Sequence, residues 1–162
     1  MDEVFLGLGS NLGDRQKNLE VAGALLQDHS IDIEQASPVY ISGPWGFKSE
    51  NNFLNRVIRV KTGADPPELL DIARKTEKKM GRLTAGKVYS DRIIDIDILF
   101  YGNRIISTRT LIIPHPLLHK RIFVLKPMSD IAPGFIHPVF NKSIAELLAE
   151  STDESLIHML PD

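Results

Sequence analysis

Two aspartates interrupt the most apolar stretch of the chain, IIDIDILF at residues 93–100. This run is eight residues long and rich in β-branched side chains, which predicts a buried strand. Successive side chains of a strand point to opposite faces at about 3.3 Å per residue, so Asp95 and Asp97 share one face, roughly 6.6 Å apart. Two like charges on a buried face are unfavourable unless a cation compensates them. The pattern therefore predicts a positively charged partner.

That cation can come from the chain or from a metal ion. Arg92 precedes Asp95 by three residues and can neutralise one carboxylate, whereas a divalent metal neutralises both. Carboxylate oxygens suit Mg²⁺, Mn²⁺ or Ca²⁺ rather than zinc, and two carboxylates are too few for a closed Ca²⁺ cage. Mg²⁺ keeps several waters and often shares its coordination shell with substrate phosphates. The strand therefore favours a nucleotide-dependent enzyme that uses magnesium.

Length and composition limit the remaining possibilities. The 162 residues predict one domain, residues 1–162, with a substantial core. A net charge of −2 gives no support to a nonspecific nucleic-acid or membrane surface. The absence of cysteine excludes disulfides, thiol catalysis and thiolate metal sites. Because neither a signal peptide nor an apolar stretch of about 18 residues is evident, we expect a cytoplasmic protein.

The periodicity of apolar residues predicts strands that alternate with helices. We expect strands at residues 4–9, 31–34 (continuing towards 40), 55–61, 93–100 and 104–106. We expect helices after Asp14, from Pro66 to about Met80, and at 120–125 and 143–150, the last with Ser143 and Glu146 as a capping box. The order predicts an α+β fold: a ferredoxin-like βαββαβ antiparallel sheet, helices packed on it, and a short-helix C-terminal extension.

Several motifs follow one another along the chain, and their combination is far more specific than any one of them. They are GSNLG (9–13), PWG (44–46), FLN (53–55), Glu77 with Gly81-Arg82, DRIIDID (91–97), and PHP (114–116) with RIF (121–123). With these motifs, the chain resembles the 6-hydroxymethyl-7,8-dihydropterin pyrophosphokinases of folate biosynthesis from Gly9 to about Leu148. The resemblance implies an ATP-dependent diphosphotransferase that moves pyrophosphate from ATP to the pterin hydroxymethyl group and releases AMP.

The same resemblance implies the cofactor and the nucleotide contacts. It assigns two Mg²⁺ ions to Asp95 and Asp97, and it makes these two residues catalytic together with Arg82 and Arg92. Guanidinium groups match phosphate oxygens bidentately, although the arginines would otherwise form surface ion pairs. His115 is held between two prolines, which fixes its backbone. The residues assigned to ATP are Glu77, Arg82, Tyr89, Arg92, Ile98, His115 and Arg121.

The pterin contacts follow a different logic. A flat polar heterocycle is held by aromatic stacking on its faces and by hydrogen bonds at its edge. The resemblance implies that Phe53 and Phe123 enclose the ring, although phenylalanines are core residues in most proteins. Asn55 offers both a donor and an acceptor to the edge. The residues assigned to the pterin are Ser42, Gly43, Trp45, Phe53, Asn55 and Phe123.

Several positions depart from the commoner pattern of the family. Thr84 and Thr110 stand where other members often carry arginines. Lys87 and Arg109 lie nearby and are candidates to replace the missing phosphate contacts. Tyr89 also stands in a segment that differs from the family pattern, and it can stack on the nucleotide. The roles of individual residues in the loop at residues 82–91 therefore stay open.

Two other classes of function remain as alternatives. One is an RNA-binding module on the same fold, against which the acidic central strand and the net charge of −2 argue. The other is a magnesium-dependent phosphohydrolase or nuclease built on the paired carboxylates. Under the leading interpretation the partners are ATP and the pterin alone, without nucleic acid or membrane, and we expect a monomer.

Overall fold

The computed structural model describes residues 2–43, 51–81 and 92–161 of the chain. Strands and helices alternate in the N-terminal part of the chain, as predicted. Its elements are β1 (Val4–Ser10), α1 (Arg15–Asp28), β2 (Asp32–Ala36), β3 (Tyr40–Ser42), β4 (Phe53–Lys61), α2 (Pro66–Lys79) and β5 (Asp95–Tyr101). The C-terminal part adds β6 (Ile106–Ser107), β7 (Ile112–Ile113), a 3-10 turn η1 (Leu118–Lys120), α3 (Ile122–Ile131), β8 (Ile136–His137), β9 (Lys142–Ser143), α4 (Ile144–Glu150) and β10 (Ile157–Met159).

The central sheet is antiparallel and has the order β10-β3-β4-β1-β5, with β2 also paired to β4. The predicted second strand is thus two strands, β2 and β3, that pair with successive parts of β4. They are separated at Ser37, whose hydroxyl accepts a hydrogen bond from Val57 N–H at 2.9 Å while its own N–H donates to Val57 O at 2.8 Å. The observed order confirms the predicted α+β class.

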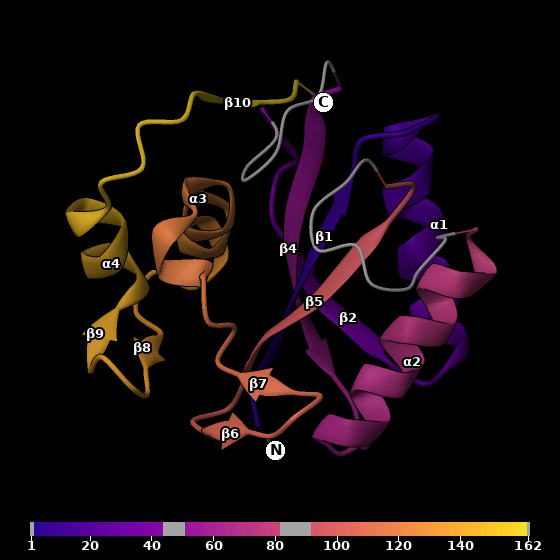
Figure 1. Cartoon of the computed structure of the whole chain (residues 1–162), viewed down its shortest axis with the longest axis horizontal. Helices are drawn as coiled ribbons and strands as arrows, with labels where there is room; N and C mark the ends of the chain where they lie inside the picture. The colour runs from indigo at the N-terminus through magenta and orange to yellow at the C-terminus, as the bar shows by residue number, and fades with distance from the viewer. Residues whose placement is uncertain (1, 44–50, 82–91, 162) are drawn as a thin grey trace.

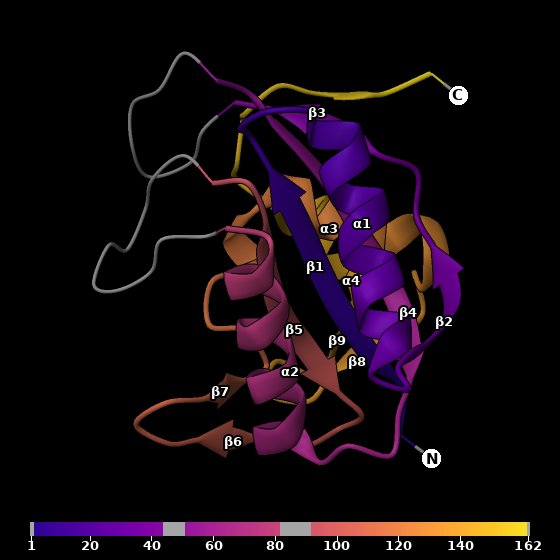
Figure 2. The same ribbon diagram turned by 90° about the vertical axis from the view of Figure 1, so that its right-hand side faces the viewer.

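Helices cover both faces of the sheet. Figures 1 and 2 show α1 and α2 against one face and α3 and α4 against the other. Side chains of β1 point alternately to the two faces of the sheet. Leu6 and Leu8 therefore join the core under α1 and α2, whereas Phe5 joins the core under α3 and α4. Over residues 2–43, 51–81 and 92–161, the structure contains no helix with the length and apolar character that a bilayer span requires.

The third helix is longer than the sequence predicts. The expected helix at 120–125 is a 3-10 turn followed by α3, which continues to Ile131 and contains Pro127. Proline inside a helix normally ends it, because it lacks an N–H donor. Here α3 buries Val124, Leu125 and Met128 against the sheet, and this burial offsets the lost hydrogen bond. The predicted capping box of α4 is confirmed, since Ser143 and Glu146 cap each other.

Candidate active site

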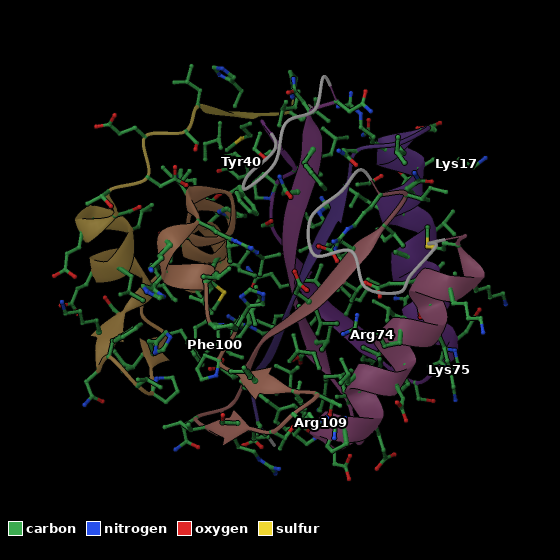
Figure 3. All side chains as sticks on the ribbon, viewed as in Figure 1. Lys17, Tyr40, Arg74, Lys75, Phe100 and Arg109 are labelled. Atoms are coloured by element: carbon green, nitrogen blue, oxygen red, sulfur yellow. The ribbon has the colours of Figure 1, made fainter. Side chains whose placement is uncertain are left out.

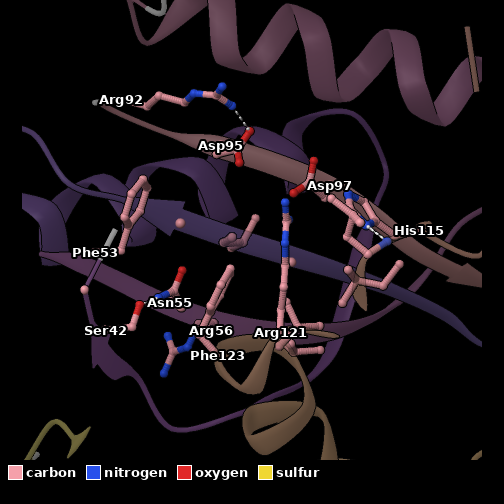
Figure 4. A pocket seen from close by; sticks show the side chains of 18 of the residues that line it. Ser42, Phe53, Asn55, Arg56, Arg92, Asp95, Asp97, His115, Arg121 and Phe123 are labelled. Atoms are coloured by element: carbon pink, nitrogen blue, oxygen red, sulfur yellow. Dashed lines mark hydrogen bonds and ion pairs between the residues drawn. The ribbon is translucent and has the colours of Figure 1, made fainter. Parts of the chain in front are cut away.

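A pocket of about 280 Å³ opens on the sheet face that α3 covers. Its floor comes from β1, β4 and β5, and one wall comes from the start of α3. It collects most of the predicted site residues that the structure describes (Figure 4): Ser42, Gly43, Phe53, Asn55, Arg92, Asp95, Asp97, His115, Arg121 and Phe123. Residues separated by up to 81 positions in the sequence therefore meet in one cavity.

Asp95 and Asp97 lie on the pocket face of β5, as the strand pattern predicts. Arg92 is the partner of the first, with Nη1 at 2.9 Å from Asp95 Oδ1. The backbone of Arg92 is fixed by Asn11, whose Oδ1 accepts the Arg92 N–H at 2.5 Å and whose N–H donates to Arg92 O at 2.9 Å. The guanidinium is thus held at a defined place beside the carboxylates.

Asp97 is the electrostatically strained member of the pair. Burial and then the neighbouring Asp95 carboxylate raise the pKa of Asp97, while Arg121 and Arg92 act to lower it. Arg121 extends from the start of α3 towards Asp97 (Figure 4). Because burial, Asp95 and the Glu77 carboxylate together outweigh the two arginines, the site favours additional positive charge near Asp97.

His115 is fixed in one tautomer. The backbone N–H of His115 donates to Leu99 O at 3.0 Å, and the ring Nδ1 accepts the N–H of Leu117 at 3.2 Å. Burial, followed by the charge of Arg121, lowers the pKa of His115 to about 4. The ring is therefore neutral at pH 7, and with Nδ1 occupied as an acceptor the proton sits on Nε2. His115 can offer this Nε2–H to an anionic oxygen in the pocket.

The opposite half of the pocket holds a buried amide between aromatic rings. Asn55 Nδ2 donates to Ser42 Oγ at 2.6 Å, which orients the amide. Phe53 comes from β4 and Phe123 from α3, so they reach the cavity from different elements (Figure 4). The Arg121 guanidinium lies 5.6 Å from the centroid of the Phe123 ring. This half can hold a flat heterocycle by its faces and its edge.

Two glycines of β1 form the floor, and the sequence prediction missed them. Gly9 pairs with Asp95 on one side and with Asn55 on the other, while Gly7 pairs with Asp97. A Cβ at Gly9 would lie 3.0 Å from Asn55 Oδ1, tighter than an ordinary contact. Glycine at every second position of a strand, in FLGLG at residues 5–9, is the sequence pattern that indicates such a bare face.

Some predicted residues lie outside the pocket. Glu77 is buried behind β5, where its Oε2 accepts the Ile96 N–H at 2.8 Å. Ile98 packs in the core on the α1 and α2 side of the sheet. Arg109 and Thr110 are exposed between β6 and β7 (Figure 3 labels Arg109). The predictions for Trp45, Arg82, Thr84, Lys87 and Tyr89 fall outside the described residues.

Comparisons with known proteins identify the family of the chain. A family model described as 7,8-dihydro-6-hydroxymethylpterin-pyrophosphokinase (HPPK) matches residues 5–133. A 2-amino-4-hydroxy-6-hydroxymethyldihydropteridine pyrophosphokinase of Aquifex aeolicus is 44% identical over 94% of each chain. The folic acid synthesis protein fol1 of Pneumocystis carinii is 40% identical over 99% of this chain, which spans only 22% of that longer protein.

A solved structure supports the fold. The crystal structure of Plasmodium falciparum HPPK-DHPS wild type with pteroate superposes with a TM-score of 0.74 at 16% identity, over 92% of this chain and 44% of that one. At this identity the likeness concerns the fold alone. From the family model and the Aquifex aeolicus relative, the chain belongs to the HPPK family, the diphosphokinases (EC 2.7.6.3) that transfer pyrophosphate to hydroxymethyldihydropterin in folate biosynthesis.

Proposed function

We propose that the pocket carries out this transfer with the triphosphate over Asp95 and Asp97 and the pterin over Asn55. The observation that carries the proposal is a row across three strands, in which Gly9 of β1 stands between Asp95 of β5 and Asn55 of β4. Neighbouring strands lie about 4.8 Å apart, so the two side chains are roughly 10 Å apart, separated only by a bare backbone. That span suits a pterin edge at one end and a phosphate at the other.

The carboxylates fit magnesium. The donors are oxygens alone, which suits a hard divalent cation. Asp97 also has its pKa raised by burial and by Asp95, so its charge is incompletely compensated by the neighbouring arginines. Over residues 2–43, 51–81 and 92–161, protein side chains form no cluster of three or more such ligands, so substrate phosphates and water would complete the shell. We propose two Mg²⁺ ions here, which would neutralise phosphate charge and orient the attacking hydroxyl.

The cationic and neutral donors of the pocket act on the phosphates. Arg121 reaches towards Asp97, and Arg92 is held beside Asp95, so both guanidinium groups face the place where charge develops during transfer. His115 adds an Nε2–H donor without adding charge. Such preorganised donors stabilise a phosphoryl transition state more than the ground state.

The pterin is held as a ligand with a defined orientation. Asn55 keeps its carboxamide oxygen towards Gly9 and its nitrogen on Ser42, which leaves its orientation fixed before the substrate arrives. Phe53 and Phe123 supply apolar faces on two sides of the same space. We propose that these contacts align the hydroxymethyl oxygen with the β-phosphorus of ATP, because catalysis of phosphoryl transfer depends chiefly on alignment.

Metal counting tests the metal site. Manganese replaces magnesium as an electron paramagnetic resonance probe, and the protein is titrated in the presence of a nonhydrolysable α,β-methylene ATP analogue. We expect two bound ions per chain for the wild type and loss of at least one for Asp97→Asn. Asp71→Asn, which removes an exposed carboxylate of α2, is the matched control and should bind both. Equal counts for Asp97→Asn and Asp71→Asn would contradict the proposed role of Asp97.

We also propose that the protein acts as a monomer. Support comes from the pocket, since one chain supplies both the carboxylates and the pterin contacts. Light scattering coupled to size-exclusion chromatography should therefore give a mass near 18.1 kDa in the presence of both substrates. A mass of twice that value would overturn this part of the proposal.

A further inference from the structure

The helix that bears Phe123 begins without a capping side chain of its own. Arg121 occupies the N-cap position of α3 and makes no side-chain capping hydrogen bond. Its guanidinium extends towards Asp97 instead (Figure 4). The first N–H groups of a helix have no partner within the helix, so their acceptors come from water or from another part of the molecule.

Asp153 supplies that acceptor from 31 residues further along the chain. Its Oδ2 accepts the Ile122 N–H at 3.0 Å. Its other oxygen, Oδ1, accepts from Ser155 N–H at 2.9 Å and from the Ser155 hydroxyl at 2.5 Å. Both carboxylate oxygens are thus engaged, so the side chain has a fixed orientation. A negative charge at this place also interacts favourably with the positive end of the helix dipole.

The charge of Asp153 is maintained by these contacts. Burial acts to raise the pKa of the Asp153 carboxyl, but the hydrogen bonds from Ser155 and from the Ile122 N–H outweigh it and hold the pKa below its ordinary value. The carboxylate is therefore ionised at neutral pH, and its bond to the helix is charge-assisted, which makes it stronger than a neutral one.

The same C-terminal segment also reaches the opposite wall of the pocket. After Asp153 the chain forms β10, which pairs with β3 so that Ile157 stands opposite Ser42. The Ser42 hydroxyl is the group that accepts from Asn55. Residues 153–157 therefore connect the start of α3 with the strand that orients Asn55. This segment lies beyond residue 133, where the match to the family model ends.

We infer that Asp153 is a positioning residue for the reaction, a role that rests on the proposed function of the pocket. The amide that it holds belongs to Ile122, which lies directly between Arg121 and Phe123. A shift of this amide moves the phosphate-side guanidinium and the pterin-side ring together. Misplacement by about 1 Å can cost a hundredfold in rate, so a backbone contact outside the cavity controls alignment inside it.

Steady-state kinetics and pterin binding test the inference. For Asp153→Ala we expect the KM for the pterin to rise about tenfold and kcat to fall about tenfold, because Phe123 and Arg121 both shift. The dissociation constant of the pterin with the nonhydrolysable ATP analogue, measured by fluorescence, should rise in parallel with KM. Asp153→Asn should recover part of the loss, since the amide keeps one acceptor oxygen.

Two controls separate positioning from loss of charge and from loss of stability. Glu154→Ala removes an exposed carboxylate one residue away and should match the wild type. Ser143→Ala removes the cap of α4 and lowers stability without reaching the pocket, so KM and kcat should not change. If Asp153→Ala fails to fold, Asp153→Asn and Ser155→Ala carry the same comparison.

Each result decides the inference. Asp153 variants with the KM and kcat of Glu154→Ala, or a Ser143→Ala variant with the same losses as Asp153→Ala, would overturn it. A wild-type protein that forms no AMP would instead overturn the proposed function. The two failures are therefore distinguishable, because the first is measured against an active wild type.

Discussion

Arg92 and Asp95 form an ion pair of 2.9 Å in the pocket, with Arg92 three residues before Asp95, the first residue of β5. The pair leaves Asp97 as the carboxylate whose charge is least compensated, and its pKa is raised by burial and by Asp95. Asp95 is thus neutralised by an arginine, whereas Asp97 favours a further cation. Arg92 has two tasks in the proposed arrangement, since it balances Asp95 and would also contact the phosphates of ATP.

Removal of the guanidinium should therefore affect turnover strongly. We expect Arg92→Ala to lower kcat by about 10²–10³, the usual cost of losing one donor to transition-state charge. Arg92→Lys should retain an intermediate rate, because it keeps the charge and loses the fork. Arg104→Ala breaks an ion pair of similar kind, to Asp2, away from the pocket and should keep the wild-type rate. Initial rates at saturating substrates provide the measurement, and equal rates for Arg92→Ala and Arg104→Ala would refute this role.

The bare floor of the pocket can be tested with one methyl group. Gly9→Ala places a Cβ 3.0 Å from Asn55 Oδ1 and 3.5 Å from Phe53, so the amide that we propose to orient the pterin must move. We expect the dissociation constant of the pterin to rise about tenfold, the loss of one good hydrogen bond. Gly63→Ala is the matched control, since nothing lies within 4 Å of its added Cβ. Titration of pterin fluorescence compares the two, and identical affinities would show that Gly9 has no such role.

Phe123 should contribute to pterin affinity through its aromatic ring rather than through its size. Phe123→Leu keeps an apolar side chain at the start of α3 but removes the aromatic face. Aromatic pairs contribute about 0.5–1.5 kcal/mol beyond the area that they bury, so we expect pterin affinity to fall about tenfold or less. Phe140→Leu changes a half-exposed ring outside the pocket and should leave affinity unchanged. Calorimetric titration with the ATP analogue present distinguishes them, and unchanged affinity in Phe123→Leu would count against stacking.

A buried histidine away from the pocket predicts how stability depends on pH. The Nδ1 of His137 accepts N–H groups of Val139 and Phe140 at 3.1 and 3.3 Å. Burial, and then His119, lowers the pKa of His137 to about 4 from the ordinary 6.5. Above pH 6.5 neither state binds this proton. As the pH falls from 6.5 towards 4, only the unfolded chain binds it, so the free energy of unfolding decreases.

Urea denaturation at two pH values measures this effect. Between pH 7.5 and 4.5, the wild type should lose about 2 kcal/mol more of its unfolding free energy than His137→Asn. Asparagine offers an acceptor oxygen but does not titrate in this range, so the histidines other than the coupled His119 contribute equally to both proteins. Parallel pH profiles for the two proteins would rule out His137 as the cause.

The sequence was sufficient wherever a local pattern determines the geometry. Alternation alone places Asp95 and Asp97 on one face, and Arg92 lies close enough in the chain to pair with the first. The capping box of Ser143 and Glu146 is likewise a local motif. For these residues the relevant partners lie within five positions, so strand and helix periods fix their directions.

Long-range register set the limit of prediction. The row of Asp95, Gly9 and Asn55 depends on how three strands pair, and the contact from Asp153 to Ile122 depends on the return of the C-terminal segment. Neither follows from a local period, because a shift of one residue in pairing would turn each side chain to the other face. The length of α3 also depends on distant contacts, because burial of its apolar side chains against the sheet outweighs the tendency of Pro127 to end the helix.

Product analysis of a single reaction shows which group the protein transfers from ATP. The protein is incubated with Mg²⁺, ATP and 6-hydroxymethyl-7,8-dihydropterin, and the products are resolved by chromatography and phosphorus magnetic resonance. We expect AMP and the pterin diphosphate in equal amounts from the wild type, and a large loss of both in Asp97→Asn. Formation of ADP or of inorganic phosphate in place of AMP, or full activity in Asp97→Asn, would contradict the account.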